Sequence, residues 1–110
     1  MLCQMMNKME QLRKTFQNEI FELWEDDREH YEDADDFIEF KYNSVELTKY
    51  ECLEFVGNDY ELVFKMEEEV CKYNVDEFGE EWTERGICKI VMFWKYMVAR
   101  DYVNQHLQQY

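Results

Sequence analysis

Residues 59–67 read DYELVFKME, and this stretch decides which fold the sequence predicts. Apolar side chains stand at every second position of it: Tyr60, Leu62, Phe64 and Met66. The positions between them hold Glu61, Val63, Lys65 and Glu67. Because successive side chains of a strand point to opposite faces, this period of two predicts a half-buried β-strand.

Two earlier segments show the same kind of pattern. FIEFKYN at residues 37–43 alternates apolar and polar side chains, and VELTKYECLEFV at residues 45–56 is strand-like. Gly57 and Asn58 tolerate positive φ and would close a tight hairpin between the second and third segments. We therefore predict a three-stranded antiparallel meander with one face on the core.

Helical periodicity flanks the predicted sheet on both sides. Residues 6–24 predict an amphipathic helix with the apolar stripe Met9, Leu12, Phe16, Ile20 and Leu23. Asn74 and Glu77 have the spacing of a capping box, which predicts a short helix ending near Gly86. Residues 87–110 predict a long helix with the core stripe Ile87, Ile90, Val91, Trp94, Met97, Val98 and Tyr102. This helix is apolar on more than one side, which indicates burial on several sides or a partner contact, and we expect Trp94 to be core.

The fold class expected from these patterns is α+β. An N-terminal helix, the meander and one or two C-terminal helices packed on one face of the sheet would form a single domain over residues 1–110. With 46% hydrophobic and 17% aromatic residues, the chain is too apolar for disorder.

The charge of the chain is concentrated in its middle. The net charge is −14, but residues 19–84 carry 24 acids against five bases, whereas the two ends are mildly basic. Eight carboxylates stand within EDDREHYEDADD, residues 25–36, which we call the acidic segment. Such a field repels phosphates, so it argues against direct binding of nucleic acid or of an anionic membrane and favours a positively charged partner.

No motif for catalysis, a metal or a cofactor stands out in the sequence. The four cysteines lie far apart, and neither histidine has ligand spacing from them, which disfavours a zinc site. The acidic segment lacks the glycine of a calcium-binding loop. We therefore expect a non-enzymatic protein without a cofactor. Since no apolar leader or membrane span is visible, we also expect a cytoplasmic location with reduced thiols.

The acids themselves are the candidate site. Carboxylates along a helix imitate the phosphates of a nucleic acid, because side chains at i and i+4 lie about 5–6 Å apart. We predict two banks of partner-binding residues, with Tyr31, Tyr73 and Trp82 as aromatic anchors. The first bank is Glu25, Asp26, Asp27, Glu29, Glu32, Asp33, Asp35 and Asp36. The second bank is Glu67, Glu68, Glu69, Asp76, Glu77, Glu80 and Glu81.

In its size, charge, aromatic content and lack of proline, the chain resembles the small acidic inhibitors that phages and mobile elements make against host defence, such as anti-restriction and anti-CRISPR proteins. The resemblance implies an inhibitor that occupies the basic nucleic-acid-binding surface of a larger protein in the host cytoplasm. That target would be a CRISPR effector, a restriction enzyme, a polymerase or a repair protein. No residue roles carry over from the resemblance.

Three other interpretations stay open. The chain could be a protein-interaction module or a homodimer that makes contact through the apolar surface of its C-terminal helix. The acid would then serve only solubility. In the second interpretation the acidic residues are a solubilising coat, and they bind no partner. The third is a small enzyme with an unrecognised site. Salt separates the first choice from the apolar interface, because only ionic binding weakens steeply with ionic strength.

Overall fold

A computed structural model describes residues 7–43, 46–71 and 84–107 of the chain. The elements in chain order are α1 (Lys8–Asp27), the 3-10 turn η2 (Arg28–His30), α2 (Ala34–Ile38), the π-helical turn η3 (Glu39–Asn43), α3 (Lys49–Phe55), α4 (Tyr60–Cys71), α5 (Glu84–Tyr102) and the π-helical turn η5 (Val103–Leu107). These described residues contain helices and no strand. The predicted α+β fold with a three-stranded meander is therefore wrong.

The stretch at residues 59–67 begins α4 instead of forming a strand. Val63 and Met66 are fully buried, whereas Tyr60 is 48% exposed and Phe64 is 53% exposed. The buried positions Leu62, Val63, Met66 and Val70 follow the period of a helix. The alternating pattern that predicts a strand thus depends on Tyr60 and Phe64, two aromatic side chains that lie outside the core.

Side-chain caps begin helices at or just before the other two segments that were predicted as strands. Asp33 Oδ1 accepts a hydrogen bond from the Asp36 amide at 2.9 Å, which starts α2 just before residues 37–43. Thr48 and Glu51 form a capping box that starts α3 within residues 45–56. Each cap satisfies amides that a helix start leaves without partners, and so favours a helix over a strand.

Gly57 and Asn58 have the positive φ angles that were predicted, but their turn joins two helices and not two strands. Gly57 has a φ of 65° and Asn58 a φ of 59°. The Asn58 amide bonds to the Leu53 carbonyl at 2.8 Å, and the Gly57 amide bonds to the Glu54 carbonyl at 3.1 Å. These bonds close the end of a helix, so the turn joins α3 to α4 and not two strands.

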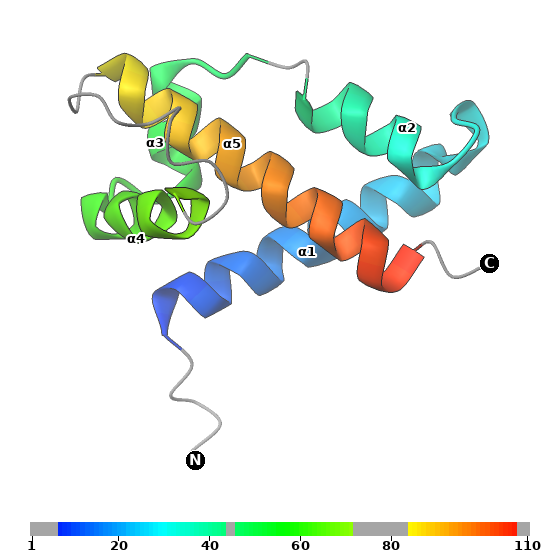
Figure 1. The fold of residues 1–110 in the computed structure, drawn as a ribbon, viewed down its shortest axis with the longest axis horizontal. Coiled ribbons are helices and arrows are strands. Elements are labelled where there is room, and N and C mark those ends of the chain that lie inside the picture. The colour runs from blue at the N-terminus through cyan, green and yellow to red at the C-terminus, as the bar shows by residue number, and fades with distance from the viewer. Residues whose placement is uncertain (1–6, 44–45, 72–83, 108–110) are drawn as a thin grey trace.

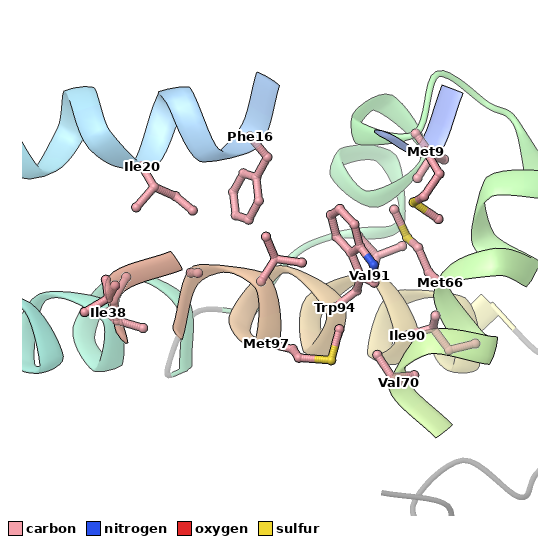
Figure 2. Close-up of a cluster of buried hydrophobic side chains, with 14 of the residues drawn as sticks. Met9, Phe16, Ile20, Ile38, Met66, Val70, Ile90, Val91, Trp94 and Met97 are labelled. Atoms are coloured by element: carbon pink, nitrogen blue, oxygen red, sulfur yellow. The ribbon is translucent and has the colours of Figure 1, made fainter. Parts of the chain in front are cut away.

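Helix α5 is the centre of the fold (Figure 1). It packs against α1, α2, α3, α4 and η3. Trp94 is fully buried, as predicted, and its ring lies 6.2 Å from the Phe16 ring of α1. Figure 2 shows Met9, Phe16 and Ile20 from α1 facing the same cluster as Met66, Val70, Ile90, Val91, Trp94 and Met97. The apolar sides of α5 are therefore covered by the chain's own helices.

The bounds of the terminal helices differ in part from those predicted. Helix α1 continues to Asp27, and Trp24 joins its buried stripe. Helix α5 begins at Glu84 and runs through Gly86, so the prediction of a helix ending near Gly86 is wrong. Beyond Tyr102 the predicted long helix continues as η5, in which Val103 and Leu107 are buried. The proposed capping box of Asn74 and Glu77 lies outside the described residues.

Candidate functional site

The acidic segment forms the turn by which the chain leaves α1 and enters α2, at the right of Figure 1. Its acids come from four consecutive pieces of backbone: Glu25, Asp26 and Asp27 from the last turn of α1, Glu29 from η2, Glu32 and Asp33 from the connecting turn, and Asp35 and Asp36 from the first turn of α2. Because α1 ends at Asp27, a straight row of acids through Glu25, Glu29 and Asp33 does not form. The acids follow a bend instead.

Three of these eight acids have partners within the fold. Asp27 lies 3.5 Å from Lys41 Nζ, which ties the end of α1 to η3. Glu25 lies 3.4 Å from Arg28 Nη1. Asp33 caps α2 as described above. These three carboxylates therefore contribute to local structure as well as to charge.

The other five acids are exposed and unpaired. Within the described residues, no hydrogen bond or ion pair engages the carboxylates of Asp26, Glu29, Glu32, Asp35 and Asp36. Like charges held close together on a folded surface repel one another, and a cation brought near them would relieve that repulsion. The structure thus brings most of the first predicted bank together on one end of the molecule.

The described acids of the second predicted bank do not join this end. Glu67, Glu68 and Glu69 lie on α4, at the left of Figure 1, on the side of the fold away from the acidic segment. Glu69 bonds to the Arg13 guanidinium and accepts a hydrogen bond from Trp94 Nε1 at 2.9 Å, so it holds α4 to α1 and α5. The remaining acids of this bank, Asp76, Glu77, Glu80 and Glu81, lie outside the described residues, as do Tyr73 and Trp82.

An exposed aromatic side chain beside the acidic segment was missed in the sequence. Phe40 is 65% exposed, and its ring lies 6.0 Å from the ring of Tyr31. Tyr31 in turn rests 5.4 Å from the buried Phe37, whose ring lies 5.3 Å from Trp24. A strand over residues 37–43 would place Phe40 on its apolar face together with Ile38 and Tyr42. The helical spacing from Asp36 to Phe40 is the signal that could have placed it beside the acids.

Several groups with shifted pKa values lie away from the acidic segment, among them Cys52 of α3 and Lys95 of α5. Cys52 is buried against Cys88, and its burial and this neighbour raise the pKa of its thiol to about 12. Burial lowers the pKa of Lys95, whose ammonium lies 4.5 Å from the Phe55 ring centroid. Lys95 also lines a cavity of about 50 Å³ with Tyr42, whose buried hydroxyl has no hydrogen-bond partner in the described part of the chain. The Cys52 thiol donates its hydrogen bond to the Cys88 carbonyl.

Other kinds of site find no support in the residues that the structure describes. Among residues 7–43, 46–71 and 84–107, no three side chains of the metal-binding types converge. The helices formed by these residues are too short or too polar to span a bilayer. No protein-family model, curated protein or solved structure matches the chain. The acidic segment and its aromatic neighbours are therefore the surface from which a function can be argued.

Proposed function

We propose that the protein is a non-enzymatic inhibitor that binds the basic nucleic-acid-binding surface of a larger protein through its acidic segment. The observation that carries this proposal is the group of five exposed, unpaired carboxylates on one end of the fold: Asp26, Glu29, Glu32, Asp35 and Asp36. A coat that serves only solubility needs neither this density nor this placement.

The mechanism would be competition for cations. Lysine and arginine side chains that hold phosphates also form charge-assisted hydrogen bonds with carboxylates. When the acidic segment occupies such side chains, a nucleic acid cannot reach them. The negative field of the segment would also steer the two proteins together, which raises the association rate at low salt.

A contact through the apolar surface of the C-terminal helix has less support. The stripe that would make such a contact includes Ile90, Val91 and Trp94, and these side chains are buried by the protein's own helices. A second copy could reach them only after the core had opened. We therefore place the partner at the acidic segment.

A charge-reversal variant tests the proposal without removing an internal contact. Asp26→Lys, Glu29→Lys and Glu32→Lys change three unpaired acids, whereas reversing Asp27 or Asp33 would break an ion pair or a helix cap. The matched control reverses three exposed acids elsewhere: Glu46, Glu54 and Glu61. Both variants change the net charge by the same amount.

The tagged parent and both variants would be incubated with lysate of the source cell, and the proteins retained would be identified. We expect the parent and the control variant to retain the same nucleic-acid-binding protein, which 0.5 M salt or added nucleic acid releases. The reversed variant should not retain it. Equal retention by all three proteins, or retention that nucleic acid does not reverse, would contradict the proposal.

A further inference from the structure

Phe40 presents an apolar ring to solvent on a fixed base. The Phe40 side chain is 65% exposed, and the neighbouring Tyr31 is half-buried. The rings of Trp24, Phe37, Tyr31 and Phe40 form a chain from the core to the surface, with neighbouring centroids 5.3 to 6.0 Å apart. An aromatic ring held in this way loses little conformational freedom on binding, which suits it to serve as an anchor.

The fold twice places an arginine between an aromatic ring and a carboxylate. Arg28 lies 5.8 Å from the Trp24 ring centroid while it pairs with Glu25. Arg13 lies 5.6 Å from the Trp94 ring centroid while it pairs with Glu69. In each case one guanidinium contacts both a ring and a carboxylate, a double contact that suits the planar fork of arginine better than the compact ammonium of lysine.

Phe40 and Tyr31 form a pair of rings near the surface, and no such cation accompanies them. Within the described residues, no arginine or lysine lies over either ring. Unpaired carboxylates adjoin both in the chain: Glu32 follows Tyr31 directly, and Asp36 lies one helical turn before Phe40. Two rings and two unpaired carboxylates thus come from the same short segment, and a guanidinium from a partner could contact both kinds of group.

We propose that Phe40 and Tyr31 form the floor of a docking site for an arginine side chain of the partner protein, with Glu32 and Asp36 as its carboxylates. This inference rests on the proposed function, and it adds that the basic partner is recognised by arginine in preference to lysine. The guanidinium stacks on the Phe40 ring and donates hydrogen bonds to the carboxylates. A lysine ammonium can also lie over a ring, as Lys95 does over Phe55. It lacks the planar fork with which a guanidinium stacks on a ring and pairs with a carboxylate at the same time.

Two labelled peptides serve as probes, one of eight arginines and one of eight lysines, and their binding is measured by fluorescence anisotropy at 0.15 M salt. The parent should bind the arginine peptide about threefold or more tightly than the lysine peptide, because only the guanidinium combines stacking on a ring with paired hydrogen bonds to a carboxylate. Phe40→Ala should bring this ratio to one. The control Tyr50→Ala removes a ring that is 74% exposed on α3, and it should leave the ratio unchanged.

The outcomes distinguish the inference from the function on which it rests. Equal binding of both peptides by the parent, or a ratio that survives Phe40→Ala, overturns the arginine site while the acidic surface stands. Failure of both peptides to bind, or binding that Asp26→Lys with Glu29→Lys and Glu32→Lys does not weaken, counts against the acidic surface itself. Circular dichroism of Phe40→Ala checks that the exposed substitution has left the helices folded.

Discussion

Trp94 Nε1 donates a hydrogen bond of 2.9 Å to Glu69, and this bond joins the central helix α5 to α4. The Arg13 guanidinium pairs with the same carboxylate and lies over the Trp94 ring. One acid of a predicted binding bank is thus the meeting point of three helices. The Glu69 carboxylate is paired with Arg13 and is less exposed than Glu68, the preceding residue of α4.

Glu69→Ala should destabilise the fold by about 1–3 kcal/mol, because it leaves the buried Trp94 N–H without an acceptor. Glu68→Ala, the control on the same helix, should change the free energy of unfolding by less than about 0.5 kcal/mol. Urea denaturation followed by tryptophan fluorescence measures both. Trp94→Phe keeps a ring but removes the donor, so its effect should not add to that of Glu69→Ala. Full additivity would mean that the hydrogen bond contributes nothing.

The capping box of α3 offers a second test of the fold. Thr48 Oγ1 accepts a hydrogen bond from the Glu51 amide at 3.1 Å. Thr48→Ala should therefore cost about 1 kcal/mol of stability, the usual effect of removing an N-cap. The control is Thr15→Ala, an exposed position inside α1 where alanine favours the helix. Comparable losses at both positions in urea denaturation would show that α3 does not begin at this cap.

The reciprocal bond of the capping box makes a prediction about pH. Hydrogen bonds to Thr48 lower the pKa of the Glu51 carboxyl in the folded chain. A lowered pKa means that the ionised form stabilises the fold. This contribution is complete above the ordinary carboxyl pKa and is lost as the pH falls through the lowered value. The stability difference between the parent and Glu51→Gln should therefore shrink from pH 7 to pH 3. A difference that stays constant over this range would contradict the prediction.

The sequence predicted the two terminal helices better than the middle of the chain, and the reason lies in particular side chains. Met9, Phe16 and Ile20 repeat at helical spacing, and so do Ile90 and Trp94, and all are buried. In residues 59–67, exposed Tyr60 and Phe64 imitate the alternation of a strand. Val63 lies in the core that α4 shares with α5 and α1, whereas Phe64 is 53% exposed. Which of the two is buried depends on these tertiary contacts, and sequence periodicity does not contain them.

Local capping signals were present and outweighed by this periodicity. Thr48 with Glu51, and Asp33 before Asp36, have the spacing of helix starts, and giving them priority would have replaced two of the predicted strands by helices. The candidate site divides in the same way. Charge density alone located the acidic segment, but the pairing of Glu69 with Arg13, 56 positions away, depends on how the helices assemble.

Cys52 should be almost inert to alkylation in the folded protein. It is fully buried, it donates a weak hydrogen bond to the Cys88 carbonyl at 4.0 Å, and its pKa is raised to about 12, so little thiolate exists at pH 8. Iodoacetamide labelling followed by mass spectrometry should find Cys52 unmodified in buffer and modified in urea. Labelling at equal rates in the two conditions would show that α3 opens readily from α5.

The unpaired carboxylates of the acidic segment should oppose folding in a salt-dependent way. Asp26→Asn with Glu29→Gln and Glu32→Gln removes three like charges and no hydrogen bond or ion pair among the described residues, so it should raise the Tm at 0.01 M salt, where the Debye length is about 30 Å. At 0.15 M salt the Debye length is about 8 Å, and the gain should fall because the repulsion is screened.

The control neutralises Glu46, Glu54 and Glu61, which come from three separate parts of the chain and should therefore give a smaller gain. Thermal unfolding followed by circular dichroism gives all four differences. An equal gain in both variants would mean that the acids of the segment feel only the overall charge of the protein, and the segment would then hold no stored repulsion for a basic partner to relieve.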